Sequence, residues 1–299
     1  MAKRIGLFIL VNILVLTTVT IVMSILGVQP YLTEYGIDYG SLMAFCAIWG
    51  MSGAFISLGL SRIMAKWMMG VKVIDPNTAD PQAGELVRTV HRLAQSANLP
   101  AMPEVGVYNS PEVNAFATGP TKSRSLVAVS SGLLQRMKRD EVEGVLGHEV
   151  AHIANGDMVT MTLIQGVINA FVMFFARIAA FAVSQAVREE MRFIVHIACV
   201  IAFQILFSIL GYFVVAAFSR WREYRADNGG ALLAGRDKMI AALKALQTGP
   251  DIHDDRQSAV AALKINNRKR GLAAYASTHP PIEDRIRRLE MGGNVPSGM

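Results

Sequence analysis

His148-Glu149-Val150-Ala151-His152 is the stretch that decides most of what this 299-residue sequence reveals. In an α-helix, residues i and i+4 lie on the same face, so both imidazoles can bind one metal ion. The spacing suits Zn²⁺, which takes ring nitrogens at about 2.0–2.1 Å. Glu149, next to the first histidine, can hold and deprotonate the attacking water. We therefore predict a catalytic zinc site; the alternative is two surface histidines on an ordinary amphipathic helix.

The flanking residues place this motif within a helix. Asp140 is suited to cap the N-terminus, and Asn155-Gly156 is a good C-terminal stop. Gly144 and Gly147 are unfavourable inside a helix, by up to about 1 kcal/mol each relative to alanine. Their presence predicts that another element packs closely against this helix.

A catalytic zinc ion needs a third protein ligand and one open position. The extended metzincin pattern does not supply it, because Asn155 and Met158 stand where that pattern requires Gly and His. Glu223 is a better candidate. It shares a helical face with Asp227, so Glu223 can bind the metal while Asp227 orients a ligating imidazole. The alternative is a solvated charged face that pairs with arginines such as Arg220.

Four apolar blocks indicate an integral membrane protein. Hydrophobic residues make up 52% of the sequence, which is high for a soluble domain. Residues 5–28 and 39–60 carry no charge and are long enough to cross a hydrocarbon core of about 30 Å. A cleaved signal peptide is the alternative for the first block. Residues 159–187 and 193–218 include Arg177 and His196, so these blocks either cross the membrane or form a hairpin that only dips into it.

The distribution of lysine and arginine predicts the orientation. Basic residues precede the first block and follow the second and fourth, whereas residues 29–38 contain none. By the positive-inside rule, the portion with the metal motif faces the cytoplasm. Glu189 and Glu190 then lie on the opposite side, which disfavours them as ligands. Cys46 and Cys199 both fall in apolar blocks, which argues against a disulfide framework and fits a reducing compartment.

The net charge of +6 is accounted for by these membrane flanks and by a basic loop at residues 264–270. We therefore expect a lipid bilayer as a partner and no nucleic acid. We also expect no nucleotide, because the sequence lacks a GxxxxGK[ST] phosphate loop.

Between the second block and the metal motif, the pattern predicts three short strands at residues 104–108, 114–118 and 126–130. The middle strand, closed by Gly119-Pro120, can bind an extended peptide by strand addition if its edge is free. Asn114 and Ala115 are therefore candidate substrate-binding residues. The alternative is an ordinary sheet strand with Phe116 in the core.

Several motifs follow one another in a distinctive order. Two apolar blocks are followed by NAFATG at 114–119, HExxH with IANGDM at 153–158, two further apolar blocks, SRWREYRAD at 219–227 and THPP at 278–281. In this order, along essentially the whole chain, the sequence resembles the HtpX family of bacterial membrane zinc metalloproteases. That family is related more distantly to the eukaryotic prenyl-protein membrane proteases.

The resemblance implies one Zn²⁺ per chain, bound by His148, His152 and Glu223, with Glu149 as the catalytic acid/base. It suggests that His279 approaches the site, where it either stabilises the tetrahedral oxyanion or covers the zinc. It implies an ATP-independent zinc metalloendopeptidase of the bacterial inner membrane that degrades misfolded membrane proteins and unfolded polypeptides in stress-linked quality control.

The expected fold class is an integral membrane α+β protein. It is mainly helical, with about four hydrophobic helices and a zincin-type cytoplasmic domain that holds a small β-sheet and the HExxH helix. We expect two N-terminal membrane helices in residues 1–66, the first part of the protease domain in 67–158, a membrane hairpin in 159–218 and the rest of that domain in 219–299.

Three other functions fit parts of the sequence. One is a membrane chaperone with a structural zinc ion whose fourth position is closed by His279. Another is a transporter, which would explain Arg177 and His196 but not the HExxH motif. The third is processing of lipidated C-termini, which would need more membrane spans for a large enclosed chamber.

Overall fold

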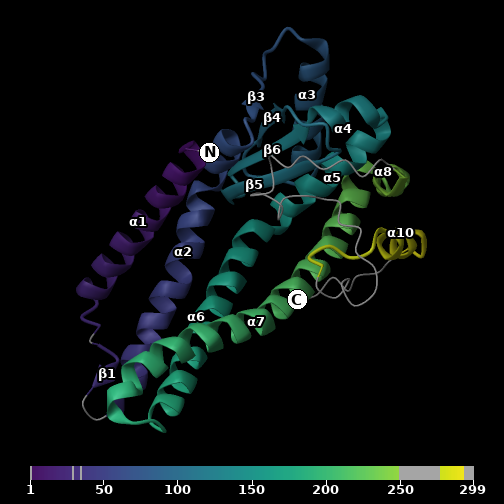
Figure 1. Ribbon diagram of the computed structural model, residues 1–299. Helices are drawn as coiled ribbons and strands as arrows, with labels where there is room; N and C mark the ends of the chain where they lie inside the picture. Colours follow the sequence, from purple (N-terminus) through teal and green to yellow (C-terminus); the bar gives the residue numbers. More distant parts are fainter. Residues whose placement is uncertain (1, 29, 34–35, 249–276, 293–299) are drawn as a thin grey trace. The chain divides into compact units, whose positions relative to one another are not determined.

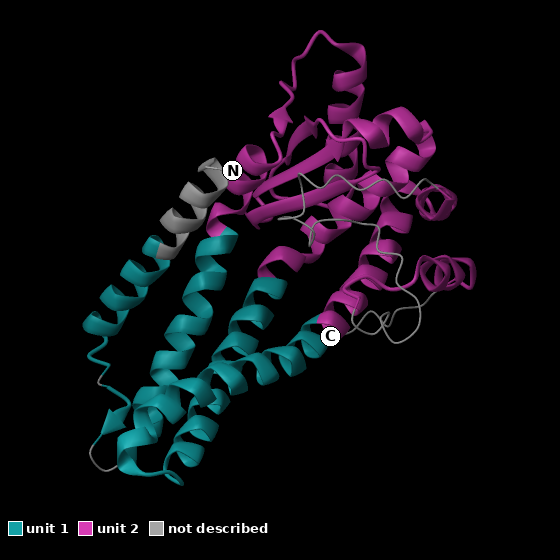
Figure 2. Ribbon diagram, in the orientation of Figure 1, with its two compact units in different colours: residues 1–58, 160–215 teal, residues 59–159, 216–299 magenta. Residues whose placement is uncertain are grey.

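The computed structural model describes residues 2–28, 30–33, 36–248 and 277–292, with the backbone alone for residues 2–12. The chain divides into two compact units, residues 1–58 with 160–215 and residues 59–159 with 216–299 (Figure 2). The expected fold class is confirmed. The chain is mainly helical, with apolar helices long enough to cross a membrane and small β-sheets.

The first unit is built from long apolar helices (Figure 1). By length and composition three of the described helices could cross a membrane, namely α2 (Tyr39–Met68), α6 (Asp157–Ser184) and α7 (Glu189–Ala234). The described side chains of α1 (Ala2–Ile25) add a shorter apolar stretch, Ile13–Ile25. Strands β1 (Leu32–Thr33) and β2 (Gly36–Ile37) form an antiparallel pair between α1 and α2.

Helix α7 is much longer than the apolar block that predicted it. It begins at Glu189 and continues as one helix to Ala234. Residues 219–227 contain no proline or glycine and include several good helix formers, so nothing in the sequence ends the helix where the apolar block ends. The same helix therefore runs from the first unit into the second and carries Glu223 and Asp227.

A four-stranded sheet in the order β3-β4-β6-β5 lies in the second unit. Strand β4 (Glu104–Tyr108) lies where it was predicted, runs parallel to β6 (Arg124–Ser130) and is antiparallel to the short β3 (Lys72–Val73), which the sequence pattern did not indicate. Strand β5 (Ala115–Thr121) is antiparallel to β6 and forms an edge of the described sheet.

The prediction that Gly119-Pro120 closes strand β5 was wrong. The strand continues to Thr121 because its register shifts between Thr118 and Thr121. Gly119 adopts a φ of 150° at this irregularity, which a residue with a side chain rarely does.

In the described part of the second unit lie five further helices: α3 (Pro81–Ser96), α4 (Ser131–Arg136), α5 (Arg139–Asn155), α8 (Arg236–Thr248) and α10 (Ile282–Glu290). Buried side chains of the sheet and of α3, α5 and α8 form one core. It includes Val90, Leu93, Val127, Val129, Leu146, Val150, Ile153 and Leu246. Helix α5, which carries the HExxH motif, is thereby held against the sheet on one side and α8 on the other.

The ends of α5 agree only in part with the prediction. Gly156 ends the helix in the left-handed conformation, with a φ of 71°, as expected of Asn155-Gly156. The N-cap, however, is Lys138 and not Asp140. The Glu141 side chain accepts the Lys138 backbone N–H at 2.7 Å, so the helix begins earlier. Asp140 lies in the first turn and pairs with Lys238 at 3.3 Å.

Glycines allow α7 and α8 to approach α5 closely, as Gly144 and Gly147 predicted. A Cβ at Gly147 would lie 2.9 Å from the Ala234 Cβ. From the other side, a Cβ at Gly230 would lie 2.9 Å from the His148 backbone nitrogen. At these positions a larger residue would push α7 away from the HExxH helix.

Candidate metal centre

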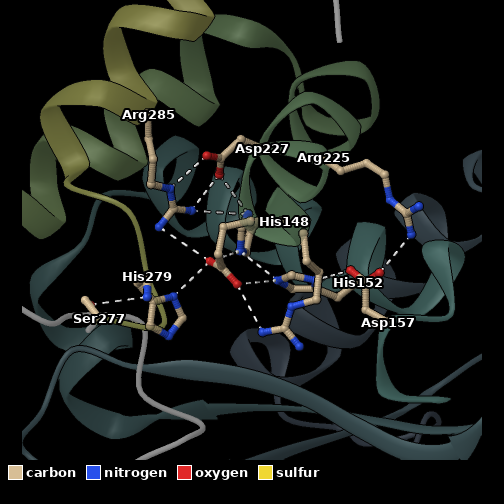
Figure 3. A network of polar contacts seen from close by, with 10 residues as sticks. His148, His152, Asp157, Arg225, Asp227, Ser277, His279 and Arg285 are labelled. Carbon is tan, nitrogen blue, oxygen red and sulfur yellow. Dashed lines mark hydrogen bonds and ion pairs between the residues drawn. The ribbon is translucent and has the colours of Figure 1, made fainter. Parts of the chain in front are cut away.

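His148, His152 and Glu223 converge on one buried point, as the sequence predicted (Figure 3). The two Nε2 atoms are 3.1 Å apart. The Glu223 carboxylate lies 3.5 Å from His148 Nε2 and 3.4 Å from His152 Nε2. Helix α5 supplies both histidines one turn apart, and α7 supplies the glutamate. All three residues are buried.

Each imidazole is oriented by an aspartate on its other nitrogen. His148 Nδ1 lies 3.0 Å from Asp227 Oδ1, as the shared face of Glu223 and Asp227 predicted. His152 Nδ1 lies 2.6 Å from Asp157 Oδ2. Because a carboxylate accepts the Nδ1 proton, each Nε2 is directed toward the shared point.

An arginine in turn holds each aspartate (Figure 3). Arg285, on α10, donates from two nitrogens to Asp227 at 2.6 and 2.7 Å. Burial alone would raise the pKa of Asp227, but the Arg285 guanidinium holds that pKa below its usual value. Arg225, on α7, donates to Asp157 at 2.8 Å.

Sequence reasoning missed Asp157, Arg225 and Arg285. For Arg285 a signal exists: on α10 it falls on the same stripe as Ile282, Ile286 and Leu289, at helical spacing. An arginine on an apolar stripe that packs into a core needs a buried partner. Arg285 is only 1% exposed, and the partner is Asp227.

Glu223 and Asp227 do not form a solvated charged face, which was the alternative reading. They are 1% and 2% exposed. Arg220, named there as a possible partner, donates to the Ser277 carbonyl at 3.0 Å. Burial alone would raise the pKa of Glu223, but the surrounding histidines, His279 above all, hold that pKa well below its usual range.

His279 does reach the site. Its Nδ1 lies 3.0 Å from Glu223 Oε2, although the two atoms are not aligned for a hydrogen bond. The backbone N–H of His279 donates to the Ser277 hydroxyl at 3.3 Å. The loop before α10 is thereby tied to α7, since Arg220 holds Ser277.

The donor set fits a divalent cation. With each Nδ1 proton directed at an aspartate, two imidazole lone pairs and a carboxylate face one another, and Glu223 Oε2 is buried without a hydrogen bond. Nitrogens bound to one tetrahedral zinc ion are about 3.3 Å apart, close to the 3.1 Å between the two Nε2 atoms. Without metal, burial alone would lower the pKa of His148, but the neighbouring carboxylates of Asp227 and Glu223 raise it to about 9.

Glu149 lies beside the first histidine and is 4% exposed. Among the residues that the structure describes, none donates a hydrogen bond to its carboxylate. With no such donor in the described part of the chain, the Glu149 carboxylate beside three metal-type ligands is available to accept a proton from water.

Asn114 and Ala115 do not present their side chains to a substrate. Both are buried, and the Asn114 amide donates to the Tyr108 hydroxyl at 3.0 Å. The backbone is arranged differently. Ser130 donates its N–H to the Asn114 carbonyl at 2.9 Å, and bonding alternates along an antiparallel pair. The backbone groups of Ala115 and Ala117 therefore point away from β6, toward the edge that β5 forms in the described sheet.

The family model of Peptidase family M48 matches residues 80–291. A Protease HtpX homolog of Bacillus licheniformis is 59% identical over 297 residues, which is 97% of this chain and 99% of that protein. The corresponding protein of Bacillus subtilis is 58% identical over 298 residues, again 97% of this chain and 99% of the relative. Protease HtpX of Shewanella oneidensis is 50% identical over 294 residues, with 96% and 99% covered.

Among solved structures, the crystal structure of S. mikatae Ste24p has a similar fold, with a TM-score of 0.64 and 16% identity. The match covers 97% of this chain but only 65% of that protein, so this chain spans about two thirds of its length.

Proposed function

The chain belongs to Peptidase family M48 and is a membrane-associated metalloprotease, and on this premise we propose a specific activity. It is a zinc-dependent, ATP-independent endopeptidase that cleaves misfolded or damaged membrane proteins on the cytoplasmic side of the bacterial inner membrane. His148, His152 and Glu223 bind the metal, and Glu149 is the catalytic acid/base.

One observation carries this proposal: two imidazole nitrogens and a carboxylate converge while each Nδ1 is held by an aspartate. Two histidines and one glutamate form a ligand set typical of catalytic zinc with an open position. No thiolate is part of the group. Only one of its three ligands is an oxygen donor, whereas Mg²⁺ and Ca²⁺ prefer sites built from oxygen ligands.

The chain's own residues supply the proton chemistry. When bound, zinc polarises the scissile carbonyl and acidifies water. Glu149 takes a proton from the attacking water and passes it to the leaving amine. His279 lies beside Glu223, a proposed metal ligand, and so borders the place where the substrate would react. We assign it the stabilisation of the oxyanion, in keeping with its place in the THPP motif.

The open edge of β5 is the proposed substrate-binding element. An extended peptide can pair with the outward-facing backbone groups of Ala115 and Ala117. Backbone pairing selects for an unfolded segment and not for particular side chains. This fits a quality-control protease that must cleave many sequences.

The proposed orientation rests on charge. Basic residues precede the first apolar block and follow the second and fourth, whereas residues 29–38 between α1 and α2 have none. We place residues 67–158 and 219–299 in one protease domain facing the cytoplasm, and residues 1–66 and 159–218 in the membrane.

The test is cleavage of an unfolded polypeptide by the purified full-length protein in lipid vesicles, without ATP. We expect cleavage that is lost on chelation and restored by one equivalent of Zn²⁺. Cleavage that survives complete removal of metal would contradict the proposal. Bound zinc without cleavage of any unfolded substrate would instead favour a chaperone whose zinc is covered by His279.

A further inference from the structure

Asp157 occupies an unusual place at the junction between two helices. It is the first residue of α6 and directly follows Gly156, which ends α5. Gly156 interrupts the helix with a φ of 71°, and at this junction the Asp157 carboxylate lies against His152, with Oδ2 2.6 Å from Nδ1. Asp157 is 2% exposed, so water does not compete for this contact.

Arg225 binds both sides of the same junction. One of its guanidinium nitrogens donates to Asp157 Oδ1 at 2.8 Å and to the Asn155 carbonyl at 3.2 Å. The guanidinium also packs over the ring of Trp221, 5.0 Å from its centroid. One cation thus ties the last turn of α5 to the first residue of α6.

The other histidine of the motif, His148, is held in the same way, by Asp227 and then Arg285. The two chains of contacts differ in origin. Asp157 belongs to a helix long and apolar enough to cross a membrane, so the orientation of His152 depends on the first turn of that helix. Neither Asp157 nor Arg225 belongs to the group of metal-type ligands.

From this geometry we infer that Asp157 and Arg225 are a positioning pair for His152. Asp157 fixes the Nδ1–H tautomer of His152, which leaves Nε2 free for the metal, and Arg225 fixes the Asp157 carboxylate. The inference rests on the proposed metal site. Carboxylates that orient a ligating histidine typically change metal affinity 10–100-fold when removed.

The test measures Zn²⁺ affinity of the full-length protein by competition with a chromophoric chelator. We expect Asp157→Asn to weaken binding about 10–100-fold, because the amide can present N–H to Nδ1 and invert the tautomer. Arg225→Met should weaken binding less, and Arg225→Lys should recover most of the loss. Two controls should match the wild type: Asp140→Asn on the exposed first turn of α5, and Arg92→Met at a separate ion pair.

A second readout separates positioning from general stability. The absorption spectrum of the Co²⁺-substituted protein reports ligand geometry, and it should change in Asp157→Asn and not in the two controls. A role in folding alone would lower the melting temperature of the metal-free protein and leave the spectrum unchanged.

The inference would be overturned if both Asp157→Asn and Arg225→Met bound Zn²⁺ within twofold of the wild-type affinity and kept the wild-type Co²⁺ spectrum. If Asp157→Asn does not fold, the comparison of Arg225→Met with Arg225→Lys decides the matter, and equal affinity in these two variants would overturn it. A wild-type protein that binds no zinc would overturn the proposed metal site itself.

Discussion

Replacing Gly230 with alanine tests whether the close approach of α5 and α7 builds the metal centre. The added Cβ would lie 2.9 Å from the His148 backbone nitrogen and 3.1 Å from its Cα, whereas ordinary contact begins at 3.4 Å. Relieving the closer contact requires the two helices to separate by about 0.5 Å. Metal–ligand distances tolerate only about 0.2 Å, so the glutamate on α7 can no longer share an ion with the histidines on α5.

The expected effects on stability and metal binding differ. Overpacking costs about 1–3 kcal/mol, and replacing a helical glycine with alanine recovers about 1 kcal/mol, which leaves a net loss of about 0–2 kcal/mol. Zn²⁺ affinity should fall at least about tenfold, as for loss of a supporting contact. The variant should therefore remain folded but bind metal poorly.

The assay compares urea unfolding of the metal-free protein with Zn²⁺ affinity for the same samples. Gly84→Ala in α3 is the matched control, because the nearest atom to its Cβ would be the flexible end of Arg88, at 3.1 Å. That control should keep full metal affinity and gain up to about 1 kcal/mol in stability. Wild-type Zn²⁺ affinity in folded Gly230→Ala would refute the claim that helix approach sets the site.

Three further predictions concern ligand identity, pH and substrate location. Glu223→Gln should lower zinc content and activity together, whereas Glu189→Ala and Glu190→Ala should change neither; full zinc content in Glu223→Gln would mean that another residue is the third ligand. Because the pKa of metal-free His148 is raised to about 9, Zn²⁺ must displace a proton, so Zn²⁺ affinity should increase from about pH 6 to about pH 9 and then level off. A titration that is flat over this range would show that the pKa of metal-free His148 is not raised and that Zn²⁺ displaces no proton there. A cleavable segment tethered a few residues from the cytoplasmic membrane boundary should be cut faster than the same segment in a stably folded soluble host; equal rates would argue against a site close to the membrane.

The residues of the metal centre could be predicted because their geometry is local. Helical periodicity alone places His148 beside His152 and Glu223 beside Asp227. The sequence does not by itself bring these two pairs together. Gly144 and Gly147 indicated that α5 is closely packed, but not that its partners are α7 and α8.

The supporting contacts depend on tertiary structure and were harder to foresee. The role of Asp157 depends on the turn at Gly156 between α5 and α6, and that of Arg225 on the continuation of α7 past the apolar block. Arg285 lies 58 residues from Asp227, and only its place on an apolar stripe hints at a buried partner. The N-cap of α5 was misplaced because an early acidic residue can either cap a helix or occupy its first turn.

The most direct test of the central claim measures bound zinc and cleavage of unfolded casein in the same samples of wild type and Glu149→Gln. Glu149 is beside the ligands but is not one of them, so the variant should retain its zinc and its fold. Loss of the general base should reduce cleavage by about 10²–10⁴-fold or more. Comparable turnover by zinc-loaded Glu149→Gln would contradict the account, as would a wild-type protein that cleaves casein equally well without metal.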